Sequence, residues 1–369
     1  VVNSVYQLFT AVHMRTAILR EPEADLLLTD VTPQLKECRT RLEETGLFHR
    51  ILWGTTLQWC KKYAGAKGEV LTEGFRDPRS VLHWTLSDEL GDYSEVYFSN
   101  FDPFIRLLAC WFYRQPCAFF CYEDGFSSYV IDALREDRAP INRHPEGRRI
   151  REKLAGVLLY EPRLAMRGDG VRNLPLPKVR REEGEGKTLL NHIFDYKKPE
   201  DLADFIFLEQ SFRAEGIRTN DIALMRICQQ AVGPGRFLVK PHPRNPENLP
   251  LQLGLTRKYP GRAPWELFLL NEPPDAYTVI TVCSNAALTG RLVFDADPPV
   301  VMLYRLFEGK VLWKEDAILQ KYLGKFHRQF GGKHYYVPKT GYELNHILAY
   351  LGGCHEPVSY THLTLPTIR

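Results

Sequence analysis

Short apolar runs alternate along the chain with segments of mixed polarity. In the first half this pattern predicts strands at 1–9, 24–29, 49–53, 96–100 and 117–122, and helices at 10–20, 34–44, 103–113 and from Ser127 or Ser128 on. In the second half it predicts strands at 205–208, 237–240, 277–282 and 299–304, and helices at 220–230, 265–270, from Ser284 on and at 341–351. Strands that are apolar throughout and alternate with helices are typical of parallel sheets covered on both faces. We therefore predict an α/β protein.

The middle of the chain breaks the alternation. Residues 153–165 are predicted to be helical, and 168–187 are rich in glycine, proline and charge, which is typical of a linker. A length of 369 residues also favours two domains over one. We predict an N-terminal Rossmann-like domain at 1–167 and a C-terminal one at 188–357, with parallel sheets facing across a cleft.

Composition excludes several classes of protein. The net charge of +3, from 48 basic and 45 acidic residues, is too small to indicate nucleic-acid binding. No apolar run approaches the roughly 18 residues that span a bilayer, and no signal peptide is recognisable. The eight cysteines form no CxxC pair, which favours reduced, buried thiols in a cytoplasmic protein.

Both ends of the sequence are unusual. Val1 stands at the head of a strand-like run, so we expect that a natural start with its methionine has been lost. The segment 358–369 continues no pattern of the second domain and resembles translated cloning adapter. We therefore exclude this probable foreign tail from the fold prediction.

Polar residues follow three of the predicted strands. The first group is Glu123, Asp124 and Gly125. Two adjacent carboxylates repel each other, which raises the pKa of one of them, and such a group can take a proton from an alcohol. Gly125 allows a tight turn or the close approach of a substrate. The alternative is an ordinary Asp-Gly turn.

The second group follows the strand at 237–240 and reads Lys240, Pro241, His242, Pro243, Arg244. The prolines end the strand and stiffen the backbone around the histidine, which two fixed positive charges flank. Such a histidine at the carboxyl end of a strand suits a phosphate leaving group. The alternative is a surface loop with a solvated histidine.

The third group, Ser284 and Asn285, combines a hydroxyl, an amide and free backbone N–H groups at a helix start, which predicts an anion site. The alternative is a plain helix N-cap. The sequence Asp295-Ala296-Asp297 has the form of a metal motif, but it precedes a strand and favours a solvated turn. We expect no metal site.

The order of these three motifs resembles that shared by bacterial sialyltransferases of GT-B architecture. In addition, the opening Val5-Tyr6-Gln7-Leu8-Phe9-Thr10-Ala11 is similar to the first strand and helix of glycosyltransferase family 52, which includes lipooligosaccharide sialyltransferases. The resemblance implies transfer of sialic acid from CMP-sialic acid to a glycan acceptor, with inversion and without a metal or other cofactor.

The resemblance also implies roles for individual residues. Glu123 or Asp124 matches the catalytic base, while His242 matches the histidine that binds or protonates the CMP phosphate. Ser284 matches the serine that contacts this phosphate, although Asn285 replaces the second hydroxyl of the motif. The same resemblance makes Asp221, near the start of the preceding helix, a rival base. Further substrate-binding residues are Tyr6, Gln7, Gly125, Lys240, Pro243, Arg244 and Asn285.

Several alternatives stay open. The motifs also allow a GT-B enzyme with another donor such as a UDP-hexose, a sugar-nucleotide epimerase, a polyol-phosphate polymerase, or a non-catalytic nucleotide-sugar-binding protein. The resemblance leaves a homodimer open. The basic run from Arg143 to Arg151 favours a solvated face, with peripheral contact to the inner bacterial membrane as the alternative.

Overall fold

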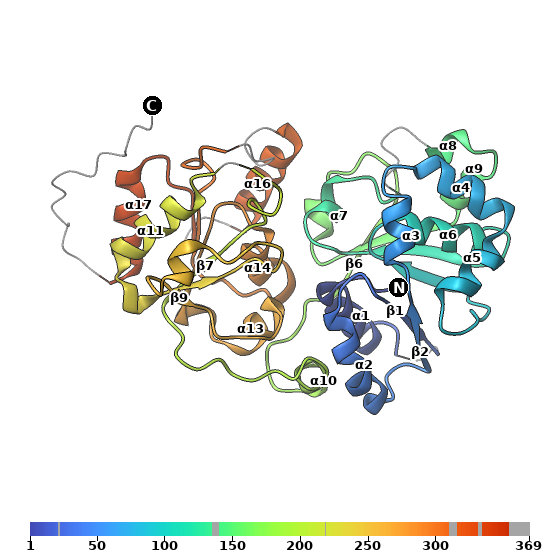
Figure 1. Ribbon diagram of the computed structural model, residues 1–369, viewed down its shortest axis with the longest axis horizontal. Helices are drawn as coiled ribbons and strands as arrows, with labels where there is room; N and C mark the ends of the chain where they lie inside the picture. Colours follow the sequence, from blue (N-terminus) through green and yellow to red (C-terminus); the bar gives the residue numbers. More distant parts are fainter. Residues whose placement is uncertain (21–22, 135–139, 218, 310–315, 331–333, 354–369) are drawn as a thin grey trace. The chain divides into compact units, whose positions relative to one another are not determined.

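The computed structural model describes residues 1–20, 23–134, 140–217, 219–309, 316–330 and 334–353, shown in Figure 1. These residues form two compact units. Unit 1 comprises Val1–Lys198, Arg262–Glu272 and Arg291–Asp295, and unit 2 comprises Pro199–Gly261, Pro273–Gly290 and the described residues from Ala296 on. All strand pairs in both units are parallel, so the predicted α/β class is confirmed.

The sheet of unit 1 is built around the first residues of the chain. Val2 forms a parallel bridge to Leu28, and the Val1 amino group donates to the Tyr97 carbonyl at 2.8 Å. On one side lie β1 (Asp25–Thr29) and β2 (Arg50–Gly54). On the other side the order is β3 (Glu95–Phe98), β4 (Ala118–Tyr122), β5 (Leu154–Leu159), β6 (Asn173–Pro175). The strand order therefore reverses beside Val2, which makes this point a topological switch point.

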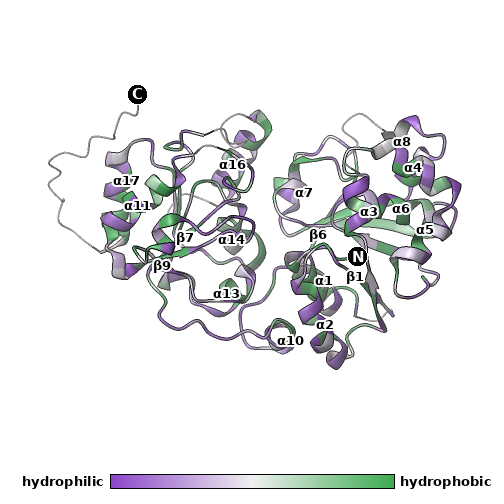
Figure 2. Ribbon diagram, in the orientation of Figure 1, coloured by the Kyte–Doolittle hydropathy of each residue, from purple (hydrophilic) through white to green (hydrophobic). Residues whose placement is uncertain are grey.

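Helix α6 (Pro103–Phe112) is the apolar centre of the helical layer in unit 1 and packs against helices at Leu57–Lys62, Lys67–Arg76 and Pro78–Thr85. Figure 2 shows α6 mainly in the hydrophobic colour and the charged α2 mainly in the hydrophilic one. The remaining helices of unit 1 are α1 (Val5–Ala17), α2 (Gln34–Thr45), α3 (Leu57–Lys62), α4 (Lys67–Arg76), α5 (Pro78–Thr85), α7 (Ser127–Val130), α8 (Pro140–Arg143), α9 (Gly147–Glu152), η1 (Pro162–Leu164), α10 (Glu185–Ile193) and α13 (Trp265–Asn271).

Unit 2 contains one six-stranded parallel sheet. Its order is β12 (Tyr335–Tyr336), β11 (Val300–Met302), β10 (Thr278–Thr281), β7 (Phe205–Leu208), β8 (Phe237–Lys240), β9 (Arg257–Lys258). The chain proceeds outward from β7 in one direction and from β10 in the other. A switch point therefore lies between β7 and β10, where open α/β sheets bind their ligands outside the carboxyl ends.

Helices cover this second sheet, and α11 (Asp221–Val232) packs against α17 (Gly341–Leu351), as Figure 1 also shows. Helix α14 (Thr289–Phe294) begins in unit 2 and ends in unit 1. The remaining helices of unit 2 are η2 (Pro234–Arg236), α12 (Leu249–Gln252), η3 (Pro274–Ala276), η4 (Asn285–Ala287) and α16 (Ala317–Phe330).

The predicted strand at 1–9 is wrong beyond its first residues. Val2 pairs in the sheet, but α1 begins at Val5 because the Ser4 hydroxyl accepts the Gln7 backbone N–H and caps the helix. The run of valine, tyrosine, leucine and phenylalanine has high strand propensity. A side-chain cap and the burial of one helix face outweigh that propensity here.

The predicted helix at 153–165 is also wrong, because Leu154–Leu159 form β5 between β4 and β6. A short apolar run has no periodicity that separates a buried strand from a buried helix. Gly156 fits this strand closely, since a Cβ there would lie 2.5 Å from the Leu174 side chain of β6.

The segment predicted as a linker, 168–187, contributes β6 and the start of α10 to unit 1. Unit 1 instead continues to Lys198, and later segments that include α13 return to it. Glycine, proline and charge at 168–187 accompany a strand at the edge of the sheet, where such residues are tolerated. The predicted foreign tail, 358–369, lies outside the described residues.

Cysteines and the acidic triplet agree with the sequence analysis. The described cysteines are free thiols, and all except Cys60 are buried. Asp295 and Asp297 lie between α14 and the amino end of β11, with Asp297 3.2 Å from a His334 ring nitrogen. The triplet thus lies outside the helices and strands, at the edge opposite to the carboxyl ends of the strands.

Candidate active site

Glu123 is the first residue after β4 and is fully buried. One of its carboxylate oxygens accepts the Tyr129 hydroxyl and, at 2.9 Å, the Tyr160 backbone N–H. The other lies 3.4 Å from the Tyr6 hydroxyl. Burial raises the pKa of Glu123 to about 7, and the Tyr129 hydroxyl and Tyr160 N–H oppose that rise. The cause is desolvation, whereas we predicted repulsion by Asp124.

Asp124 is half-buried and has different surroundings. Its backbone N–H donates to the Ser128 hydroxyl at 2.8 Å, and its carbonyl accepts the Ser127 hydroxyl. The two serines that we predicted as helix caps therefore hold the turn instead. Gly125 has a φ of +74°, a left-handed conformation that favours glycine. This turn leaves Asp124, of the two acidic neighbours, as the one within reach of a substrate.

Gln7 positions the Asp124 carboxylate. The Gln7 amide nitrogen donates to Asp124 Oδ2 at 3.0 Å, and its amide oxygen accepts the Asn3 backbone N–H at 2.7 Å. Because a backbone N–H can only donate, this second contact fixes which end of the buried amide faces Asp124. The Asn100 side chain, after β3, is a further donor at 3.5 Å. These contacts suit a positioning role for Gln7, whereas we predicted that it binds substrate.

Asn3 holds the start of α1 in place. Its side-chain amide donates to Asp102 at 2.7 Å and accepts the Thr29 hydroxyl at 2.8 Å. Through Asn3, these bonds connect Thr29 at the end of β1 to Asp102, the N-cap of α6. Tyr6, which we predicted to bind substrate, turns toward Glu123, and burial followed by the Glu123 charge raises the pKa of its hydroxyl.

In unit 2, His242 follows β8 at the carboxyl edge of the sheet. Its Nδ1 accepts the Arg244 backbone N–H at 3.3 Å, so Nε2 carries the proton of the neutral ring. Burial, and after it the Arg244 charge, lower the pKa of His242 below its usual value of 6.5. The free protein therefore presents a neutral imidazole whose Nε2–H can donate a hydrogen bond at pH 7.

Glu209 anchors the backbone of this histidine. Glu209 follows β7, is buried, and accepts the His242 backbone N–H at 3.2 Å. The Arg213 guanidinium donates to both of its oxygens, at 3.1 and 3.2 Å, and Asn248 donates as well. A buried carboxylate with this many donors stabilises the loop that carries His242.

The two cations beside His242 have different surroundings. The Lys240 ammonium lies 5.1 Å from the centre of the Tyr259 ring. Arg244 is exposed and donates to Ser211 and Glu215 at 3.0 and 3.2 Å. Exposed pairs of this kind contribute about 0–1 kcal/mol, so an anionic ligand can displace Glu215 at little cost. Pro243 lies between His242 and Arg244, as the sequence shows.

Asp221, the rival base, lies in a buried polar network. It is 4% exposed, accepts the Thr219 hydroxyl and lies 3.5 Å from the Arg213 guanidinium. Through Arg213 it belongs to the same network as Glu209. These contacts suit a role in holding Arg213 and leave Asp221 less accessible to an acceptor alcohol than Asp124.

Ser284 caps a short turn after β10, and its hydroxyl accepts the Ala286 N–H at 3.3 Å. The element is the 3₁₀ turn η4 and not the helix start that we predicted for an anion site, and it is too short to add a helix dipole. The Ser284 hydroxyl still has a proton to donate. The Asn285 amide oxygen is buried without a partner among the described residues, which suits a donor group on a ligand.

The sequence analysis did not identify several residues near the carboxyl ends of the strands in the two units. They include Asn3, Asn100, Tyr129 and Tyr160 in unit 1 and Glu209, Gln210 and Arg213 in unit 2. Gln210 spans the switch point, because its amide accepts the Cys283 N–H at 2.7 Å and donates to the Cys283 sulfur. The polar pair Glu209-Gln210 directly after an apolar strand was an available signal for the edge of β7.

The described part of the chain contains neither a cluster of metal ligands nor a membrane-spanning helix. No group of three or more histidine, cysteine, aspartate or glutamate side chains there is placed to hold a metal ion. No helix in that part is long and apolar enough to cross a membrane. The exposed arginines of α9 pair with neighbouring acidic residues, as in Arg148 with Glu152 at 2.8 Å.

Comparisons with known proteins give structural likeness alone. No protein-family model and no curated protein matches the chain. The solved structure of the spinosyn rhamnosyltransferase SpnG aligns with a TM-score of 0.46 and 11% identity over 95% of this chain and 90% of that one. The S. aureus MnaA-UDP co-structure aligns with a TM-score of 0.37 and 10% identity over 92% and 100%, respectively. At such TM-scores, neither likeness assigns a donor or a reaction.

Proposed function

We propose that the protein is an inverting glycosyltransferase of GT-B architecture that transfers sialic acid from CMP-sialic acid to a galactoside-type acceptor of a bacterial surface glycan. The observation that carries this proposal is the position of His242 and Ser284. They follow β8 and β10, on opposite sides of the switch point in one parallel sheet. A nucleotide phosphate is a suitable ligand for such an edge.

The proposed donor site uses neutral hydrogen-bond donors and nearby cations. The Nε2–H of His242 and the hydroxyl of Ser284 donate to the phosphate oxygens, and Lys240 and Arg244 supply positive charge. Because the pKa of His242 is lowered, the ring stabilises the departing phosphate as a hydrogen-bond donor rather than as an imidazolium acid. The Asn285 amide oxygen accepts from a hydroxyl or amino group of the nucleoside.

The proposed acceptor site is the carboxyl edge of β4. Asp124 takes the proton of the acceptor hydroxyl, whose oxygen attacks the anomeric carbon of the donor as the bond to the CMP phosphate oxygen breaks. The transition state has oxocarbenium character, as in glycoside hydrolysis. Gln7 donates to the Asp124 carboxylate, and the turn at Gly125 fixes its position. The buried Glu123 anchors the start of this turn in the core of unit 1. General-base help of this kind contributes on the order of 10²–10⁴-fold in rate.

The experiment is a comparison of donors. The purified protein is incubated with lactose and either CMP-sialic acid or a UDP-hexose, and the transferred sugar is identified by mass spectrometry. We expect a sialylated lactose whose anomeric configuration is inverted, and the same rate in the presence of EDTA. Transfer from the UDP-hexose alone would contradict the donor proposal and retain the transferase class. Loss of the rate in EDTA, restored by Mg²⁺, would contradict the metal-independent chemistry.

A further inference from the structure

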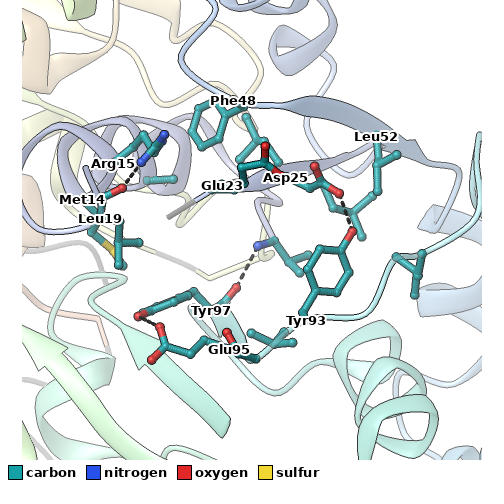
Figure 3. A pocket seen from close by; sticks show the side chains of 18 of the residues that line it. Met14, Arg15, Leu19, Glu23, Asp25, Phe48, Leu52, Tyr93, Glu95 and Tyr97 are labelled. Atoms are coloured by element: carbon teal, nitrogen blue, oxygen red, sulfur yellow. Dashed lines mark hydrogen bonds between the residues drawn. The ribbon is translucent and has the colours of Figure 1, made fainter. Parts of the chain in front are cut away.

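Two acidic side chains around the cavity of unit 1, a space of about 240 Å³ shown in Figure 3, are already paired. Asp25 accepts the Tyr93 hydroxyl and the Arg50 guanidinium, each at 2.6 Å. Glu95 accepts the Tyr97 hydroxyl, also at 2.6 Å. A ligand in this cavity would have to displace such contacts, whereas the surface of unit 2 presents side chains that are open to a partner.

Three leucines of unit 2 project into solvent from one short segment. Leu249, Leu253 and Leu255 are 60%, 61% and 52% exposed, and they belong to α12 and the turn that follows it. Single exposed apolar side chains are common on protein surfaces. Three of them so close together form a patch, here called the leucine patch, and apolar patches mark surfaces that bind a partner or a membrane.

Hydrogen bonds hold the backbone under the leucine patch in place. Asn248 caps α12, and its side chain accepts the Leu251 N–H at 2.9 Å. The Leu255 carbonyl accepts the Arg226 guanidinium and the Gln229 amide of α11, each at 3.0 Å. The leucines are thus presented by an ordered segment, and docking of such a segment costs little conformational entropy.

Cations without acidic partners lie beside the leucine patch. Arg226 contacts the Leu255 carbonyl, and the exposed Arg257 donates to two backbone carbonyls at 2.7 and 2.8 Å. In the part of the chain that the structure describes, neither guanidinium has an ion-pair partner. Lys258 pairs with Glu247 at 2.9 Å, but both side chains are exposed and such a pair is weak. The patch therefore carries uncompensated positive charge.

This combination fits an anionic bilayer better than a second copy of the chain. Apolar side chains enter the boundary between headgroups and acyl chains, while nearby cations attract anionic lipids. A second copy on the same patch would bring its own cations to the interface. In addition, the edge strand β9 consists of Arg257 and Lys258, and charged side chains on an edge strand oppose pairing with another chain.

We propose that the leucine patch docks unit 2 on an anionic phospholipid bilayer. Leu249, Leu253 and Leu255 enter the boundary of the acyl chains, and Arg226 and Arg257 supply positive charge to the headgroups. The membrane contact thus lies at this segment and not at the basic run of α9, where Arg148 pairs with Glu152.

The docking segment is joined to the loop that carries His242. The buried Glu209 carboxylate accepts the side-chain amide of Asn248, the cap of α12, and also the His242 backbone N–H at 3.2 Å. Docking would therefore hold the donor loop close to a lipid surface, where a lipid-linked glycan acceptor lies. This consequence rests on the proposed function, whereas the docking itself does not.

The test is co-sedimentation of the full chain with vesicles of phosphatidylcholine, either alone or mixed with phosphatidylglycerol. We expect the parent to bind the anionic vesicles at least about 10-fold more tightly than the neutral ones. A variant with Leu249→Ser, Leu253→Ser and Leu255→Ser should bind the anionic vesicles at least about 100-fold more weakly than the parent. Arg257→Gln should weaken this binding by about 5-fold and leave binding to neutral vesicles unchanged.

The matched control replaces three other exposed apolar side chains of unit 2. Ile318, Tyr342 and Tyr350 are 48%, 70% and 68% exposed, so their joint replacement by serine removes a comparable apolar surface. This control variant should sediment with the anionic vesicles like the parent. Melting temperatures of all variants, measured beside the binding, should stay close to that of the parent because the replaced side chains are exposed.

Two results would overturn the proposal. One is equal binding of the parent and the leucine variant to anionic vesicles, including the case in which neither binds. The other is a parent dimer in light scattering that the leucine variant converts to a monomer without any change in vesicle binding, which would assign the patch to a second copy. These readouts require neither donor nor acceptor, so failure of the docking is distinguishable from failure of the proposed transferase activity.

Discussion

Glu123 and Asp124 are adjacent in the sequence and differ in what surrounds their side chains. The buried Glu123 has a pKa of about 7, above the ordinary value of 4.5. Because the folded state then binds the proton more tightly than the unfolded state, this residue favours folding at low pH and loses that contribution as the pH rises from 4.5 to 7. The loss amounts to about 3 kcal/mol.

Glu123→Gln should remove this pH dependence, since the amide cannot ionise. We expect the difference in unfolding free energy between the variant and the parent, measured by urea denaturation, to move in favour of the variant by about 3 kcal/mol between pH 4.5 and 7. Parallel pH profiles for the two proteins would show that Glu123 does not have the raised pKa.

Gln7 tests whether the orientation of Asp124 matters. Gln7→Met keeps the approximate volume, removes the donor to Asp124 and leaves the Asn3 N–H unpaired, which costs about 1–3 kcal/mol in stability. We expect kcat to fall by about 10- to 100-fold, because a misplaced base slows the chemical step. The KM for the sugar donor, CMP-sialic acid, should stay unchanged.

Gln229→Met is the matched control for Gln7→Met, because Gln229 is equally buried on α11 and bonds the Leu255 carbonyl and Thr256. It should lose similar stability and retain full activity. Equal kinetic loss in both variants would mean that general destabilisation explains the effect, and would contradict a positioning role for Gln7.

At the scale of elements, the turn after β4 depends on one glycine. Gly125→Ala places a Cβ on a residue with φ +74°, which costs about 1–2 kcal/mol and shifts the Asp124–Ser128 turn. Gly46→Ala is the control: Gly46 has φ +60° at the end of α2, with open space around its Cβ. We expect similar thermal destabilisation for both variants and a large loss of transfer activity for Gly125→Ala only.

The loop after β8 depends on Glu209 in a comparable way. Glu209→Gln leaves the largely buried Arg213 with a weakened partner, and we expect a loss of about 3 kcal/mol in unfolding free energy together with weaker CMP binding by calorimetry. Glu215→Gln, which alters an exposed pair with Arg244, should change stability by less than about 0.5 kcal/mol. A stable Glu209→Gln variant with normal CMP affinity would argue against this anchor.

The strands that bear the site could be predicted because their signal is local. The run at 237–240 is apolar and ends at a proline, and the structure has β8 at Phe237–Lys240. Prediction fails where local signals are ambiguous. The apolar run at 154–159 predicts a helix but forms β5, and the strand predicted at 1–9 overlooks the helix cap at Ser4. The serines after Gly125 were read as helix caps because their partner, the Asp124 backbone, is fixed only by the turn.

At the scale of the whole molecule, the polar networks could not be read from the sequence. Gln7 and Asp124 are 117 residues apart, and Glu209 and His242 are 33 apart. Such pairs meet only after the parallel sheet has aligned the ends of its strands. The assignment of α13 to unit 1 likewise depends on long-range packing. The composition of 168–187, from which we predicted a linker, carries no information about that packing.

The proposed mechanism depends on two residues, Asp124 as the base and His242 as the group that stabilises the departing phosphate. The most direct measurement is galactoside-stimulated release of CMP from CMP-sialic acid by the parent protein and by Asp124→Asn, Asp221→Asn and His242→Ala, with CMP affinity measured in parallel. We predict a loss of at least about 10²-fold in Asp124→Asn with unchanged CMP affinity, and a loss of about 10²–10³-fold with weaker CMP binding in His242→Ala. Full activity in Asp124→Asn, together with none in a folded Asp221→Asn variant, would contradict this mechanism and transfer the role of base to Asp221.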